Sequence, residues 1–314
     1  MGYSLGFDAG GTKTDCVVLD ARGAVLGEGS GGPGNPLRSG YDGAFSSLRE
    51  AAARALSSAQ IRTPDVTAVC GGLAGAGRRS VLRRVMVFLS REFPRALTQV
   101  VADYEVALEA AVGPGPGVVL IAGTGSVAFG RNGAGETARA GGYGPWIGDE
   151  ASAFEIGRRA VSVVARTRDA DAPATVLGEM ISAALDCPDW DDLMLRIMKN
   201  PDDVFPKLFP VVAAAAESGD SAANEILFGS AFGLANLAMI VIRRLGMNDM
   251  QFPLVKCGGV FGHSRLLDSL LDSVLASGIL RAEISRLEIP PAVGAARMAA
   301  RLSVSPSQAA SHGA

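Results

Sequence analysis

The motif that most constrains the fold lies near the start of the chain, in residues 6–14. An apolar segment, residues 3–7, leads into Asp8 and a small-residue turn, and a second apolar segment, residues 15–20, follows at once. Glycines in such a turn let backbone N–H groups close around an anion, because no side chain blocks its approach. A carboxylate beside that anion is best explained by a hydrated cation between them. The motif therefore predicts a turn that binds a magnesium nucleotide.

Two better-known glycine motifs do not fit this segment. A Walker A loop places its lysine directly after the last glycine and opens a helix, but here Thr12 separates Gly11 from Lys13 and a strand-like segment follows. A dinucleotide-binding fingerprint also requires a helix after its glycines. An ordinary glycine-containing hairpin remains the alternative interpretation of this segment taken alone.

The composition excludes several classes of protein. With 48% hydrophobic and 19% charged residues, the 314-residue chain is predicted to be compact and soluble, with room for two medium domains or one large one. A net charge of -3 gives no basic surface for nucleic acid or for an anionic membrane. Four widely spaced cysteines argue against a disulfide framework or a zinc site, and two histidines are too few for a multi-histidine metal centre.

The sequence also carries signals about location. We find no signal peptide before the first expected strand, and we expect reduced thiols in a cytoplasmic protein with no nucleic-acid or membrane partner. The uncharged run in residues 226–242 is slightly short for a membrane span and contains Asn236, so it is predicted to be a buried core helix.

The expected elements of the first half alternate in a defined order. Apolar spacing predicts strands in residues 3–7, 15–20, 24–28, 65–70 and 98–102, and helices in residues 41–60, 79–93 and 104–112. The glycine-rich residues 29–36 look too broken for regular structure. An antiparallel opening followed by parallel crossovers is the ribonuclease-H-like arrangement.

A degenerate repeat of the opening motif follows an expected domain boundary at residues 113–117. Residues 118–130 again read as strand, small-residue turn and strand, with Ala122 in place of the aspartate. Two such hairpins predict two similar domains that clamp one polyphosphate. The predicted domains are residues 1–113 and 114–290. A helical insertion is expected at about 172–219, and the sequence does not indicate its function. A final helix is expected at 291–302, where it could pack back on the first domain. The tail at 303–314 is predicted to be disordered.

Taken together, these motifs resemble a known superfamily. Residues 8–14, 101–103, 123–126 and 258–259 are similar to the five-part signature of the actin, sugar-kinase and Hsp70 ATPases. Residues 141–153, 72–77 and 291–296 resemble the N-acetylglucosamine kinase family, grouped with the BadF/BadG/BcrA/BcrD-type ATPases. The resemblance extends to about residue 300. It implies two actin-like ATPase domains, each a mixed five-stranded sheet flanked by helices, with an interdomain cleft.

The resemblance implies a role for each candidate residue. Asp8 would hold Mg²⁺ through water, and Asp103 would be the general base that accepts a proton from the sugar 6-hydroxyl as ATP gives up its γ-phosphoryl group. A helix N-cap is the alternative role for Asp103. The nucleotide would be bound by Gly10, Gly11, Thr12, Lys13, Thr14, Thr124, Gly125, Ser126, Gly258 and Gly259.

The sugar would be bound by Asn35, Asp149 and the backbone of Gly142 and Tyr143, together with Asp103. We also expect Asp149 to cap a helix beginning near residue 151. Ala140, Tyr143 and Ala151 depart from the cysteine, tryptophan and glycine common in that family, so the identity of the sugar is open among N-acetylglucosamine, glucosamine, N-acetylmuramic acid and glucose.

Other functions are possible on the same fold. The family also contains ATPase activators of CoA-ester reductases or dehydratases, which hold an iron–sulfur cluster at a dimer interface, but this chain has no cysteine in the expected segment. A sugar-responsive transcription regulator would need a helix-turn-helix ahead of Asp8. The kinase interpretation is favoured, with ATP and Mg²⁺ as cofactors and a homodimer as the expected assembly.

Overall fold

The computed structural model describes residues 2–170, 175–187, 189–279 and 281–303. The chain folds into two compact units, one formed by Met1–Gly115 with Leu287–Ala314 and the other by Pro116–Arg286. The tail predicted at residues 303–314 lies, from residue 304 on, outside the described residues.

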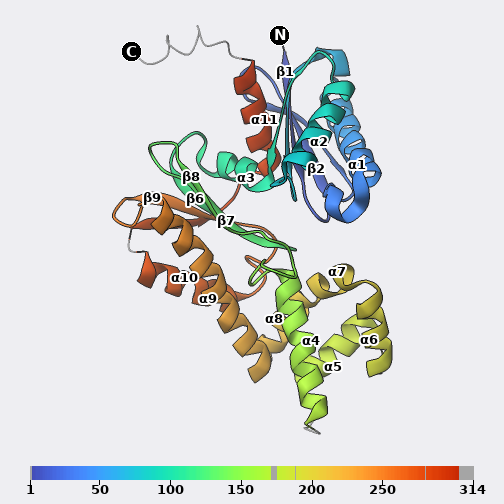
Figure 1. The fold of residues 1–314 in the computed structure, drawn as a ribbon, viewed down its shortest axis with the longest axis vertical. Helices are drawn as coiled ribbons and strands as arrows, with labels where there is room; N and C mark the ends of the chain where they lie inside the picture. The colour runs from blue at the N-terminus through green and yellow to red at the C-terminus, as the bar shows by residue number, and fades with distance from the viewer. Residues whose placement is uncertain (1, 171–174, 188, 280, 304–314) are drawn as a thin grey trace. The chain divides into compact units, whose positions relative to one another are not determined.

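The first unit is a five-stranded mixed sheet with helices on both faces (Figure 1). The sheet order is β3-β2-β1-β4-β5, with β1–β2 and β2–β3 antiparallel and β1–β4 and β4–β5 parallel. Its strands are β1 Tyr3–Ala9, β2 Thr14–Leu19, β3 Val25–Gly31, β4 Val66–Leu73 and β5 Leu97–Ala102. Its helices are α1 Pro36–Ala59, the 3₁₀ turn η1 Thr63–Asp65, α2 Arg79–Glu92, α3 Asp103–Val112 and α11 Pro291–Leu302.

The two faces of this sheet follow from the period-2 alternation of strand side chains. On β1, Leu5 and Phe7 belong to the core beneath α1 and α2. On the opposite face Gly6 meets α11, where an added Cβ would lie 2.1 Å from the Ala296 nitrogen. Only a glycine permits this close approach of strand and helix. The final helix therefore packs on the sheet that begins the chain.

The second unit repeats the topology of the first. Its sheet order is β10-β9-β6-β7-β8, again an antiparallel hairpin joined to parallel strands. The strands are β6 Gly117–Ala122, β7 Ser126–Arg131, β8 Thr137–Gly141, β9 Phe252–Cys257 and β10 Ala282–Arg286. The helices are α4 Ala153–Asp169, α5 Val176–Leu185, α6 Trp190–Lys199, α7 Pro201–Val204, the 3₁₀ turn η2 Phe205–Leu208, α8 Phe209–Glu217, α9 Ser221–Arg244 and α10 Arg265–Gly278. The predicted fold of two mixed five-stranded sheets flanked by helices is confirmed.

Helix α9 contains the predicted uncharged run. Within the described residues it is the one helix long and apolar enough to cross a membrane, and 56% of its most apolar window is buried in the protein. Leu227, Leu234 and Val241 on this helix are fully buried in the core of the second unit. The helix therefore packs as a core element.

Three expectations about local structure are wrong. Residues 29–36 are partly regular, because β3 continues to Gly31 and its glycines at every second position let α1 approach closely. Helix α1 begins at Pro36 rather than at residue 41, with a break at Gly40, whose φ is 70°. Strand β8 is the third departure, because no strand is expected at residues 137–141.

Candidate active site

The turn predicted to bind phosphate joins β1 to β2 in the first unit. Gly10 N donates to Lys13 O at 2.9 Å and closes the turn. Gly10 O accepts from the backbone N–H groups of Gly34 and Asn35, at 3.0 and 3.1 Å. The Thr14 hydroxyl donates to Gly32 O at 2.9 Å. The turn is therefore fixed to the glycine loop that precedes α1, and the Thr14 hydroxyl is already engaged within the protein.

The exposed side of this turn carries polar and basic side chains. Thr12 and Lys13 are exposed, and Lys13 Nζ lies 2.6 Å from the Asp15 carboxylate. Sequence analysis missed a further cation, Arg38, whose guanidinium would lie 3.0 Å from a Cβ on Gly11. Arg38 is in the first turn of α1, which we had expected to begin later. The asparagine and proline before it are a recognisable helix start that could have revealed its position.

Two carboxylates lie at the same sheet edge as the turn. The parallel strands β1, β4 and β5 are in register there, with Ala9 opposite Leu73 and Leu73 opposite Ala102. Asp103 follows β5 directly, and Asp8 immediately precedes Ala9. Burial raises the pKa of Asp8 to about 7, with further increases from the negative charges of Asp103 and Asp15.

Asp103 occupies the first helical position of α3 rather than the N-cap, which is Ala102. Its Oδ1 accepts from Tyr104 N at 3.0 Å, while Glu105 Oε1 accepts from the backbone N–H of Ala102 at 3.1 Å. The N-cap interpretation of Asp103 is therefore wrong. The carboxylate stands at the carboxyl end of a parallel strand, where ligands of α/β proteins gather.

Asn35 has a structural role that we had not assigned. It is the N-cap of α1, and its Oδ1 accepts from Leu37 N at 3.0 Å. The same oxygen would lie 2.9 Å from a Cβ on Gly75, in the turn that follows β4. Asn35 thus connects the loop before α1 with the end of β4, beside the turn of residues 10–13.

The second unit gathers the remaining predicted nucleotide residues. Gly123 N donates to Gly125 O at 2.9 Å within the β6–β7 turn, which also contains Thr124. Val260 N donates to Ala122 O at 3.0 Å. Gly258 has φ of 111°, and a Cβ there would lie 2.3 Å from the same carbonyl. Gly258 and Gly259 are therefore packed against the second turn.

Asp149 lies beside this second turn. Its Oδ2 would be 2.7 Å from a Cβ on Gly125, and its Oδ1 accepts weakly from Gly144 N at 3.4 Å. Burial raises the pKa of Asp149, while hydrogen bonds from the backbone N–H groups of Gly144 and Ser126 oppose that increase. Asp149 does not cap α4. The cap is Ser152, whose Oγ accepts from Glu155 N at 3.2 Å.

The two backbone positions predicted to line the sugar site flank the same turn. Gly142 N donates to Ser126 O at 2.9 Å, and Gly142 has φ of 70°. The side chain of Tyr143, the next residue, is exposed. The Ser126 hydroxyl donates to Glu150 O at 2.6 Å, so like Thr14 it is engaged within the protein.

The acidic residues at the first turn fit a hydrated cation better than a directly coordinated one. Among the described residues, no group of three or more His, Cys, Asp or Glu side chains is close enough together to hold a metal ion. Asp8 is largely enclosed and its charge is opposed by two other carboxylates. A cation beside Asp8 would relieve that repulsion, and waters would complete its coordination, as Mg²⁺ prefers.

Comparison with known proteins gives concordant matches. The model of the BadF/BadG/BcrA/BcrD ATPase family matches residues 5–299. An N-acetyl-D-glucosamine kinase of Dictyostelium discoideum is 29% identical over 308 residues, covering 94% of this chain and 97% of that protein. An N-acetylmuramic acid/N-acetylglucosamine kinase of Clostridium acetobutylicum is 30% identical over 272 residues, covering 85% of this chain and 88% of that protein.

A solved structure shows the same fold. A candidate N-acetylglucosamine kinase from Chromobacterium violaceum superposes with a TM-score of 0.76 at 24% identity, covering 96% of this chain and 99% of the other. At that identity the likeness supports the fold alone.

Proposed function

Because the chain belongs to the BadF/BadG/BcrA/BcrD ATPase family, we propose that it is an ATP-dependent kinase that phosphorylates an amino sugar, N-acetylglucosamine or glucosamine, at the 6-hydroxyl. The observation that carries the proposal is the pair formed by Asp8 and Asp103 at the sheet edge beside the glycine turn. Asp8 is suited to hold a hydrated cation, and Asp103 is suited to accept a proton. Two curated relatives that cover most of the chain are sugar kinases by name.

Phosphoryl transfer requires mainly positioning and neutralisation of charge. In the first unit, we assign the phosphates to the backbone of Gly10 and Gly11, to Thr12 and Lys13, and to Arg38. In the second unit, we assign them to the turn of Thr124 and Gly125. Mg²⁺, when bound near Asp8, would neutralise charge on the phosphate oxygens. The Gly258–Gly259 backbone leaves room for the adenosine.

Asp103 is the proposed general base. Its place at the start of α3 keeps the carboxylate at the end of β5, where it would accept the hydroxyl proton of the sugar. Asn35 and Asp149, with the backbone of Gly142 and Tyr143, would contact the other sugar groups, because fixed acceptors and amides discriminate between hydroxyl patterns. N-acetylmuramic acid and glucose remain alternative substrates, the first because one relative is named for it.

The cysteines do not favour the iron–sulfur activators of the same family. A cluster requires accessible thiolates. Burial raises the pKa of Cys70 to about 12 and that of Cys16 well above its ordinary value, so both thiols are protonated and enclosed. Cys187 is buried as well, and Cys257 is the one partly exposed cysteine of the four. An absorbance spectrum of anaerobically purified protein would show a cluster band if this alternative were correct.

A coupled ADP-release assay tests the proposed reaction. The four sugars named above would be compared with and without Mg²⁺, and the phosphorylated product would be identified by NMR. We expect Asp103→Asn to lower kcat by about 10²-fold or more while the protein stays folded. Asp42→Asn, which removes an exposed carboxylate of α1, is the matched control. No turnover with any of these sugars, or near-normal turnover by Asp103→Asn, would refute the proposal.

The proposal includes a homodimer located in the cytoplasm. Light scattering coupled to size-exclusion chromatography measures the assembly, and cell fractionation measures the location.

A further inference from the structure

The loop of residues 149–152, between residues 141–148 and α4, has an unusual backbone. Asp149 has φ of 57° and Ala151 has φ of 59°. This left-handed region is disfavoured for residues with a Cβ, and two such residues in one four-residue loop require support from their surroundings. Ala151 is almost fully buried, with 1% of its surface exposed, so water does not hydrogen bond to its backbone there.

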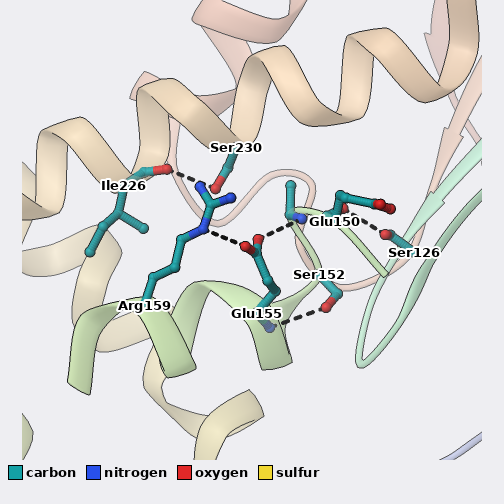
Figure 2. Close-up of polar contacts among 8 residues, drawn as sticks. Ser126, Glu150, Ser152, Glu155, Arg159, Ile226 and Ser230 are labelled. Carbon is teal, nitrogen blue, oxygen red and sulfur yellow. Dashed lines mark hydrogen bonds and ion pairs between the residues drawn. The ribbon is translucent and has the colours of Figure 1, made fainter. Parts of the chain in front are cut away.

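Glu155 supplies that support from the first turn of α4 (Figure 2). Its Oε2 accepts from Ala151 N at 2.8 Å, and its Oε1 forms an ion pair with Arg159 one turn later. The Glu155 residue is buried, with 8% of its surface exposed. One carboxylate thus joins the strained loop to the body of the helix.

The arrangement differs from ordinary helix capping. In a capping box, a glutamate at the third helical position accepts from the backbone N–H of the N-cap residue. Here the N-cap Ser152 donates its N–H to Asp149 O at 3.1 Å, and Glu155 reaches one residue further, to Ala151. The glutamate therefore fixes the loop itself, beyond the helix terminus that Ser152 already caps.

The loop is in turn the support of the β6–β7 turn. Ser126 Oγ donates to Glu150 O at 2.6 Å, and Ala153 N donates to Gly123 O at 2.8 Å. The Asp149 carboxylate lies against Gly125. A change in the path of residues 149–152 would therefore move three attachments of the turn together.

We infer that Glu155 is a positioning residue, which holds the loop of residues 149–152 in place through the left-handed Ala151 and so keeps the 123–126 turn in its phosphate-binding shape. The inference rests on the proposed function in one respect, the assignment of that turn to phosphate. Glu155 acts through Ala151 and Glu150 rather than by touching a ligand.

The test compares Glu155→Ala with Glu155→Gln, which keeps an acceptor oxygen for Ala151. Calorimetry measures the Kd of MgADP and of MgAMPPNP, and steady-state kinetics separates KM for ATP from kcat. We expect Glu155→Ala to weaken nucleotide binding on the order of tenfold and Glu155→Gln to restore most of it. Glu50→Ala, which breaks another glutamate–arginine pair at i,i+4 spacing, on α1, is the matched control and should bind normally.

A second variant, Ala151→Gly, tests whether Glu155 acts by supporting the left-handed backbone of residue 151. Glycine adopts the left-handed conformation without strain, so the loop should depend less on Glu155. The loss caused by Glu155→Ala should then be smaller in the Ala151→Gly background. Equal losses in both backgrounds would overturn the inference. If Glu155→Ala alone fails to fold, Glu155→Gln takes its place in both backgrounds.

A fluorescence readout is independent of catalysis. Trp146 packs edge-on against Phe154 at 5.3 Å between ring centroids, and in a Trp190→Phe background it would be the single tryptophan. Trp146 is 67% exposed, so the readout is its fluorescence anisotropy rather than its quenching. Glu155→Ala should lower the anisotropy of Trp146 at a temperature where the protein is folded. Unchanged anisotropy together with nucleotide binding within twofold of wild type would show that Glu155 only stabilises the helix. If wild type binds nucleotide but phosphorylates no sugar, the proposed function fails while nucleotide affinity still decides this inference.

Discussion

Replacing Asp8 by asparagine should stabilise the protein and abolish its activity. The pKa of Asp8 lies near 7 in the folded protein against an ordinary value of 3.8, chiefly because of burial and also because Asp103 and Asp15 are close. Since this pKa is raised, the folded state binds the proton more tightly than the unfolded chain. Stability is therefore lost as pH rises from about 4 to about 7, and the full penalty remains above pH 7.

The size of the effect follows from the two pKa values. If Asp8 were completely buried, its ionisation would lower the free energy of unfolding by about 4 kcal/mol at pH 8. Part of the residue is solvent-accessible, and screening reduces the expected gain of Asp8→Asn to about 1–2 kcal/mol. That corresponds to an increase in Tm of about 3–6 °C without Mg²⁺. At pH 5 the stability gained by Asp8→Asn should be less than half of its value at pH 8, because the wild-type carboxyl is already largely protonated in the folded state.

Differential scanning calorimetry in EDTA at pH 8 and pH 5 measures this difference. Tryptophan fluorescence is unsuitable, because Trp146 and Trp190 both belong to the second unit. Asp42→Asn, an exposed carboxylate of the same unit, should leave Tm unchanged at both pH values. Asp8→Asn that is destabilising at pH 8, or equally stabilising at both pH values, would refute the reasoning.

The remaining predictions concern the first unit. Gly6→Ala should destabilise it by about 2–3 kcal/mol, since the new Cβ would meet the backbone of α11, whereas Gly133→Ala, in open space, should be neutral in a denaturant titration. Arg38→Met should raise KM for ATP on the order of tenfold, and Arg38→Lys by less; equal KM values for Arg38→Met and wild type would contradict its phosphate role. Half-maximal activation should require less Mg²⁺ at pH 8 than at pH 6, because the proton on Asp8 competes with the cation.

The two sheets could be predicted because most of their strands have clear local sequence patterns. The β1–β2 and β6–β7 hairpins combine buried apolar runs with glycine turns, and their order along the chain defines the topology. Strand β8 could not be found in this way, because only Thr137 of its five residues favours a strand, whereas its two alanines and its glycine are depleted in strands.

The candidate site was predicted less completely than the sheets. Asp149 was expected at a helix N-cap because aspartate is common there, but Ser152 followed three residues later by Glu155 is the stronger capping pattern, and it was present in the sequence. The left-handed conformation of Ala151 could not be predicted, because alanine disfavours it and the Ser152–Glu155 pattern predicts that Glu155 accepts from Ser152 rather than from Ala151. Glu155 is only four residues away in the sequence, but which backbone N–H it accepts from depends on the folded path of the loop.

The route of the chain imposes an order on biosynthesis. The first unit is interrupted after Gly115 and resumes at Leu287, whereas the second is one continuous segment. A ribosome therefore releases all of the second unit before it releases α11, the helix that covers Gly6 and the apolar residues Ala68 and Cys70. The half that is made first is completed last. Nascent chains stopped before Pro291 should contain a protease-resistant second unit and an N-terminal segment that depends on chaperones, because one face of its sheet still exposes apolar surface to water.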